Sequence, residues 1–122
     1  MHTIYVDASV TREQDLTARL GHLVEAGHRV VMVAPKGHPA NDLAGPWSSV
    51  KATVPAKPPR DSWYLTTDPS TCGDRVAGLQ TVLIGPRDSS LRVTRCDSTV
   101  RDLREAVLAI LADDAMAGQP EA

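Results

Sequence analysis

The sequence of 122 residues contains no phenylalanine, and its aromatic residues amount to only 3%. Such a chain has few rings on which the bases of a single-stranded nucleic acid can stack. Its formal net charge of −2 leaves no excess of basic residues to attract a phosphate backbone or an anionic membrane. We therefore expect neither nucleic acid nor membrane among its partners.

Long apolar runs and dense cysteines are also missing. No run reaches the roughly 18 apolar residues of a membrane-spanning helix, and the N-terminal segment lacks the basic start and long apolar stretch of a signal peptide. The two cysteines, Cys72 and Cys96, lie outside any CxxC pattern, whereas a disulfide scaffold is denser in cysteine. These features favour free thiols and a cytoplasmic location.

The remaining composition is that of a globular domain. Hydrophobic residues make up 42% of the chain and charged residues 23%, which suffices for one core. The length suits one domain, to which we assign residues 1–112. Residues 113–122 are small, polar and contain Gly and Pro, so we expect a flexible tail.

Short β-favouring runs alternate with helical patterns along the chain. A helix is expected from Thr11, with Gln14 as its capping-box partner, to a left-handed Gly27. A second is expected from a cap at Ser98 or Thr99 to Leu111, and a short helical piece between residues 69 and 78. Strands are expected at residues 4–6, 29–34, 63–66, 80–84 and 93–96, with a weaker edge strand at 50–54. This alternation predicts an α/β fold: a Rossmann-like three-layer sandwich with a mostly parallel sheet.

Residues 35–62 interrupt this pattern and hold six of the nine prolines. A long irregular excursion inside a compact domain is functional or mobile. Its aromatic residue, Trp47, has two interpretations: it packs over the sheet edge, or it anchors a partner.

Two carboxylates come directly after expected strands. Asp7 follows the first strand and Asp68 follows the strand at 63–66. If these strands are parallel neighbours, both carboxylates meet at the carboxyl edge of the sheet, where open α/β sheets bind ligands. Carboxylates and carbonyls suit Mg²⁺, and an aspartate beside such a cation can attack phosphorus.

Four stretches, in this order, resemble motifs of the haloacid dehalogenase (HAD) superfamily: residues 3–11, 23–34, 63–68 and 76–87. The first, TIYVDASVT, is similar to the hhhhDxDxT motif of that family. The resemblance implies a HAD-like fold in which Asp7 is the nucleophile that forms an aspartyl phosphate. It also implies Mg²⁺ as cofactor, held by Asp7, the backbone of Ser9 and Asp68. Lys57 is the one candidate for the family's lysine, and Arg87, after Gly85-Pro86, is a second candidate contact for an anion.

Departures from the motifs bear on function. The second aspartate, a general acid and base in HAD phosphatases, is Ser9 here, and the hydroxyl residue that binds phosphate is Ala34. Lys57 lies only eleven residues before Asp68, and residues 35–62 are too few for a cap domain. The sequence therefore predicts a degenerate, capless HAD-like domain of weak or no activity, which acts as a binding or regulatory module. Its partner is a protein or a small phosphorylated ligand, and homo-oligomers are one candidate assembly.

Other interpretations of these residues stay open. The alternative function is a Mg²⁺-dependent phosphohydrolase or phosphotransferase that uses Asp7. Asp7 is otherwise an Asx-turn residue or the polar end of a buried strand, and Asp68 before Pro69 fits a helix N-cap. Ser9 has no base nearby in the sequence that would make it a nucleophile, and Lys57 and Arg87 fit ordinary solvated side chains.

Overall fold

A parallel sheet organises the chain. The computed structural model describes residues 2–12, 15–34, 45–51, 54–55, 57–68, 78–85 and 96–117. They form a six-stranded sheet in the order β3-β2-β1-β4-β5-β6, in which every neighbouring pair is parallel. This is the strand order of doubly wound Rossmann folds, so the expected α/β, Rossmann-like architecture is confirmed. The narrower HAD-like assignment stays a prediction.

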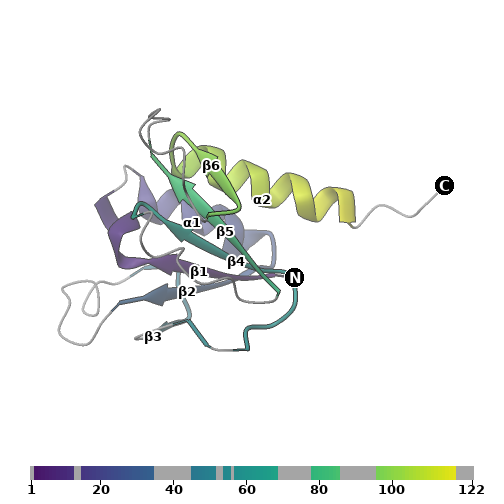
Figure 1. The fold of residues 1–122 in the computed structure, drawn as a ribbon, viewed down its shortest axis with the longest axis horizontal. Coiled ribbons are helices and arrows are strands. Elements are labelled where there is room, and N and C mark those ends of the chain that lie inside the picture. The colour runs from purple at the N-terminus through teal and green to yellow at the C-terminus, as the bar shows by residue number, and fades with distance from the viewer. Residues whose placement is uncertain are drawn as a thin grey trace.

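The elements follow one another in chain order. The first half holds β1 (Thr3–Asp7), the 3-10 helix η1 (Ala8–Arg12), α1 (Leu16–Glu25), β2 (Arg29–Val33) and β3 (Ser49–Lys51). The second half holds β4 (Ser62–Thr66), β5 (Leu79–Ile84), β6 (Ser98–Val100) and α2 (Leu103–Ala117). In Figure 1, β3 and β6 lie at opposite edges of the sheet, with β1 and β4 between them.

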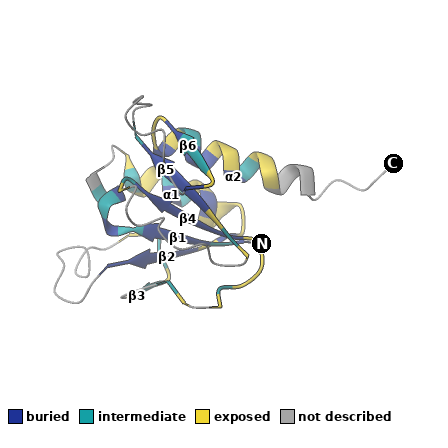
Figure 2. Ribbon diagram, in the orientation of Figure 1, coloured by how far each residue is buried: buried dark blue, intermediate teal, exposed yellow. Residues whose placement is uncertain are grey.

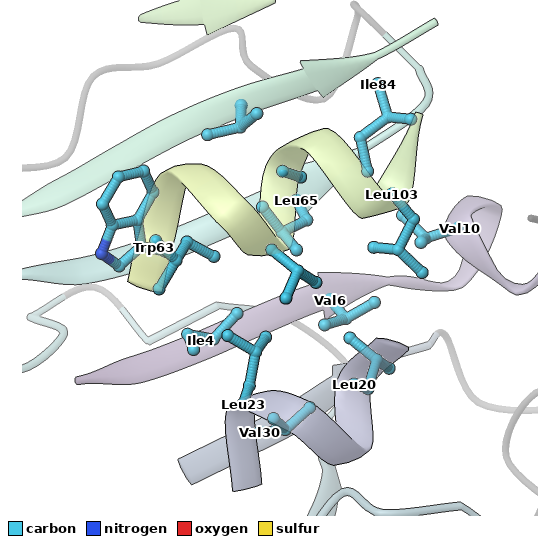
Figure 3. Packing of buried hydrophobic residues seen from close by; sticks show 14 of the residues in the cluster. Ile4, Val6, Val10, Leu20, Leu23, Val30, Trp63, Leu65, Ile84 and Leu103 are labelled. Carbon is cyan, nitrogen blue, oxygen red and sulfur yellow. The ribbon is translucent and has the colours of Figure 1, made fainter. Parts of the chain in front are cut away.

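The main core lies between one face of the sheet and both α-helices. Alternate strand residues such as Ile4, Val6 and Leu65 point to this face and pack against Leu20 of α1 and Leu103 of α2 (Figure 3). All five residues are at most 1% exposed. Both described α-helices therefore cover the same face of the sheet. Burial of the apolar stripe of each helix against this face stabilises the main core.

The opposite face has its own smaller apolar cluster, formed by Tyr5, Val31, Val33 and Tyr64. Strand residues alternate between faces, so this cluster interleaves with the main core along β1, β2 and β4. Figure 2 shows these central strands buried while the outer sides of the helices are exposed. Burial on both faces explains why β2 is an almost unbroken apolar run.

The first helix begins later than the sequence predicts. Residues 8–12 form η1, and the Thr11 hydroxyl donates to the carbonyl of Ala8 rather than capping a helix. The N-cap of α1 is Asp15, in a left-handed conformation with φ of 57°. The expected capping box is thus wrong, because a local hydroxyl bond favours a tight turn there; Gln14 itself lies outside the described residues. Gly27 does take the expected left-handed φ, at 93°.

The last strand and helix are also shifted from their expected places. Ser98–Val100 is strand β6, paired with β5, and is not the helix start. The cap of α2 is Asp102, whose Oδ1 accepts a hydrogen bond from the Glu105 N–H at 2.8 Å. β-Branched Thr99 and Val100 fit a pleated strand better than a first helical turn. α2 runs to Ala117, so residues 113–117 are helical, and the expected flexible tail at 113–122 stays a prediction.

Other expectations fall partly within the described residues. The weak edge strand is present as β3, and Trp47 packs against the main core, as its packing interpretation predicts. The expected helical piece after Asp68 lies outside the described residues, as do expected strand residues 93–95. No helix in the described ranges is long and apolar enough to cross a bilayer.

The state of Cys96 corrects the expectation of free thiols. Cys96 is disulfide-bonded, and it packs with Leu83 on the second face of the sheet. The chain has one other cysteine, Cys72, which lies outside the described residues. The low cysteine content predicted free thiols. A single bridge can nevertheless form wherever the fold brings two thiols together.

Reducing the disulfide is expected to lower the free energy of unfolding by about 2–4 kcal/mol, since the unfolded chain gains freedom when the cross-link is lost. Urea unfolding with and without a phosphine reductant measures the change. A thiol titration of the unfolded, unreduced chain should find no free thiol. Two titratable thiols without reductant would contradict this prediction.

Tyr5 is expected to destabilise the fold at alkaline pH. Burial raises the pKa of its phenol above the usual 10.0, against an opposing effect of Arg29. The folded chain therefore holds this proton at a pH where the unfolded chain has lost it. The free energy of unfolding must then fall as the pH rises above about 10.

The Tyr5→Phe variant removes this titration. Its urea-unfolding free energy should decline less steeply than that of the wild type between about pH 9 and pH 11. Equal slopes for the two proteins would show that Tyr5 does not contribute.

Candidate functional site

Asp7 and Asp68 lie at the ends of neighbouring parallel strands. β1 pairs with β4 in a register that places Tyr5 beside Tyr64 and Val6 beside Leu65. Asp7 is the last residue of β1, and Asp68 comes two residues after the end of β4. Both residues therefore come at the carboxyl edge of the sheet.

Both carboxylate oxygens of Asp7 accept hydrogen bonds. Its Oδ1 accepts from the Tyr64 hydroxyl at 3.0 Å. Its Oδ2 accepts from the Ser9 hydroxyl at 2.6 Å and from the Ser9 backbone N–H at 3.1 Å. The bond from the N–H two residues on is that of an Asx turn. The charge of this half-buried carboxylate is thus met by donors of the protein itself.

Thr66 joins this arrangement from the end of β4. It is fully buried, and its Oγ1 lies 3.5 Å from Asp7 Oδ2 and 3.4 Å from Ser9 Oγ. The Ser9 hydroxyl in turn accepts from the Thr67 backbone N–H at 3.1 Å. We call Asp7, Ser9, Tyr64 and Thr66 the Asp7 cluster. It ties the end of β1 and the start of η1 to β4.

Asp68 contacts the cluster through its backbone. Its N–H donates to Thr66 Oγ1 at 3.1 Å, and its carbonyl lies 3.3 Å from the same hydroxyl oxygen. The residue as a whole is exposed. The residues after it lie outside the described ranges, so its expected role as a helix N-cap stays a prediction.

Lys57 is the one candidate anion contact within the described residues, and it forms no hydrogen bond or ion pair with Asp7. Lys57 is exposed and belongs to the segment that enters β4 at its amino end, whereas Asp7 ends β1 at the carboxyl edge (Figure 1). Arg87 lies outside the described residues. Ala34 is 1% exposed, packs in the main core and donates its N–H to the carbonyl of Lys51.

Sequence reasoning missed Tyr64 and Thr66 as partners of Asp7. They lie on the same sheet face as Tyr5 and Asp7, because side chains two residues apart in a strand share a face. The register between β1 and β4 puts Thr66 next to Asp7, but nothing local in the sequence fixes that register. Every second residue of the segment 62–66 is polar, namely Ser62, Tyr64 and Thr66. This alternation was the one signal in the sequence that pointed to these partners of Asp7.

Comparisons of the chain with protein-family models, with curated proteins and with solved structures yield no match. The chemistry of the site therefore has to be argued from its own geometry.

Removing one donor tests the Asp7 cluster. Tyr64→Phe deletes the hydroxyl that bonds Asp7 Oδ1 and should lower the free energy of unfolding by about 1–2 kcal/mol, because a hydrogen bond to a charged group is lost at a half-buried site. Chemical denaturation near neutral pH measures the loss.

Tyr5→Phe is the matched control for this variant. Tyr5 is the in-register neighbour of Tyr64, on the same face, and its hydroxyl forms no hydrogen bond with a described residue. Its loss should change the free energy of unfolding by less than about 0.5 kcal/mol near neutral pH. Equal losses in both variants would mean that the bond to Asp7 contributes nothing.

Proposed function

We propose that this chain is a degenerate, HAD-like binding module in which Asp7 is a structural hydrogen-bond acceptor and not a nucleophile. The observation that carries the proposal is that both oxygens of the Asp7 carboxylate accept hydrogen bonds from the protein: Tyr64 donates to one oxygen, and Ser9 donates twice to the other. An aspartate that attacks phosphorus needs one oxygen for the attack and the other for the cation. Here both are engaged by donors from the protein.

The missing catalytic groups support the same conclusion. Ser9 stands where a HAD phosphatase has its acid and base, and its hydroxyl donates to Asp7 at 2.6 Å. Serine cannot protonate a leaving alkoxide as a carboxylic acid does. Ala34 offers no hydroxyl, and Lys57 forms no hydrogen bond or ion pair with a described residue. The Asp7 cluster therefore stabilises the charge of Asp7 but lacks the general acid and the phosphate-binding hydroxyl of a HAD phosphatase.

The residues fit Mg²⁺ poorly. The resemblance assigns the ion to Asp7, the Ser9 backbone and Asp68, yet hydroxyl and amide donors already contact both oxygens of Asp7, and Mg²⁺ would have to compete with them there.

The alternative function is a Mg²⁺-dependent phosphohydrolase or phosphotransferase. One observation favours it: Asp7 and Asp68 follow neighbouring parallel strands at one sheet edge. This alternative requires the Tyr64 and Ser9 hydroxyls to turn away from Asp7 when a cation binds. It is therefore separable from the binding module by experiment.

The cytoplasmic location expected from the sequence rests on free thiols, and Cys96 is disulfide-bonded. Disulfides persist mainly in oxidising compartments. We therefore propose that the chain works in such a compartment, and binding measurements should keep the disulfide intact.

Thermal unfolding with Mg²⁺ alone, and with Mg²⁺ plus beryllofluoride as a mimic of phosphate on aspartate, tests the proposal. The midpoint should move by less than about 1 °C in either condition, because a ligand raises stability only when it binds the folded state. A panel of phosphoesters should show no Mg²⁺-dependent turnover.

Two variants accompany this measurement. Asp7→Asn removes the carboxylate in question. Asp15→Asn is the control, since asparagine also tolerates the left-handed conformation of that residue. A wild-type midpoint that rises with beryllofluoride, in a way that Asp7→Asn abolishes and Asp15→Asn retains, would establish the phosphotransfer alternative instead.

A further inference from the structure

Two buried histidines meet at the amino ends of neighbouring strands, at the other end of β1 from the Asp7 cluster. His2 comes directly before β1 and His28 directly before β2, one step ahead of the first register pair of these strands. His2 is 8% exposed and His28 is 4% exposed. Their rings stack with centroids 5.2 Å apart and an angle of 12° between the ring planes. The pair therefore joins the starts of β1 and β2.

A hydrogen bond fixes the protonation of His28. The His2 backbone N–H donates to His28 Nδ1 at 3.0 Å, and the bond is buried. A backbone N–H can only donate, so Nδ1 carries no proton and the neutral ring has its proton on Nε2. A proton added to Nδ1 would face the His2 N–H, with one donor against another. The His28 ring is therefore neutral for as long as this bond exists.

The backbone of His28 connects three elements. Its N–H donates to the carbonyl of Leu23 at 3.0 Å. Together with the left-handed Gly27, this is the bond of a Schellman motif that ends α1. The Arg29 N–H, next along the chain, donates to the His2 carbonyl at 3.0 Å. A change at the His28 ring is thus felt at the end of α1 and at the starts of β1 and β2.

Acid opposes this arrangement, because a solvated histidine takes up a proton near about pH 6.5. In the closed arrangement, His28 can accept that proton only if it loses the bond from the His2 N–H and holds a charge in a buried site. The open arrangement therefore binds more protons than the closed one below this pH. It follows from linkage that the closed arrangement loses stability as the pH falls.

Neighbouring charges alter this balance only in part. The C-terminal end of α1 attracts a positive charge, but a partial charge at a helix end does not replace a lost bond and the hydration of a buried cation. Tyr5 of β1 belongs to the apolar cluster on the opposite face of the sheet, and Met1 lies outside the described residues. The charged and titratable groups of the surrounding described elements are exposed and screened by solvent. They are His22 and Glu25 of α1, Arg29 of β2, Arg60 and Asp61 before β4, and Asp113 of α2.

We infer that the contact between His2 and His28 is a pH-sensitive switch: below about pH 6, protonation of His28 releases the start of β1 from β2 and from the end of α1, while the centre of the sheet stays paired. The inference goes beyond the proposed function, because it concerns the amino edge of the sheet and does not depend on the role of Asp7. It makes this edge the part of the binding module that responds to acidification.

Amide hydrogen exchange of the whole chain, followed by NMR with the disulfide intact, tests the inference. The reporter is the Arg29 N–H, which donates to the His2 carbonyl. Its protection factor, corrected for the intrinsic effect of pH on exchange, should fall by at least about tenfold from pH 7 to pH 5. Amides at the centre of β1 and β2 should lose less protection. Unchanged protection of the Arg29 N–H would overturn the inference.

The tautomer of His28 is a second measurement on the wild-type chain. Long-range ¹H–¹⁵N spectra of the imidazole rings at pH 7 should show a proton on Nε2 of His28 and none on Nδ1. A proton on Nδ1 at pH 7 would contradict the hydrogen bond on which the switch depends. Both wild-type measurements decide the question even if a variant does not fold.

Three variants assign the response to His28. His28→Asn offers an amide oxygen near the place of Nδ1 and does not titrate, so it should remove most of the difference between pH 7 and pH 5. His28→Ala lacks the acceptor and should show at pH 7 the low Arg29 protection that the wild type has at pH 5. His22→Asn is the matched control, because His22 is an exposed histidine of α1, and it should respond as the wild type does.

A response of wild-type size in His28→Asn would assign the effect to another group and overturn the inference. None of these results bears on Asp7, whose role is decided by the beryllofluoride measurement.

Discussion

The parallel pairing of β1 with β2 on one side and β4 on the other is the constraint on which the rest of the structure depends. Parallel neighbours need long crossovers, and their strands are buried on both faces. The pairing also gathers all carboxyl ends at one edge of the sheet and all amino ends at the other. The molecule thereby acquires two edges of different chemistry.

At the carboxyl edge, hydrogen-bond donors of the protein itself stabilise the charge of Asp7. Asp7 ends a buried strand, where an unsatisfied carboxylate would be costly. Hydroxyls from η1 and β4 meet that charge and link the two elements to β1. The arrangement that stabilises the strand end also occupies the oxygens that phosphotransfer would use. A position that resembles a nucleophile in sequence thus acts as a structural acceptor in our proposal.

At the amino edge, the aspartates among the described residues are exposed to solvent. Asp97 is fixed by Thr81, but Asp61 and Asp113 have no ion-pair partner among the described residues.

The sequence by itself determined the α/β class, the position of β2 and the edge strand near Val50, because apolar periodicity and strand length are local properties. It also determined that Asp7 and Asp68 follow strands. The start of α1 at Leu16 and the strand at Ser98–Val100 depended on competition between local hydroxyl bonds, capping and pairing with β5. The partners of Asp7, the bridge at Cys96 and the stacked pair of His2 and His28 were decided only by the tertiary structure. Each joins residues far apart in the chain, and strand register, which no local pattern encodes, sets which of them meet.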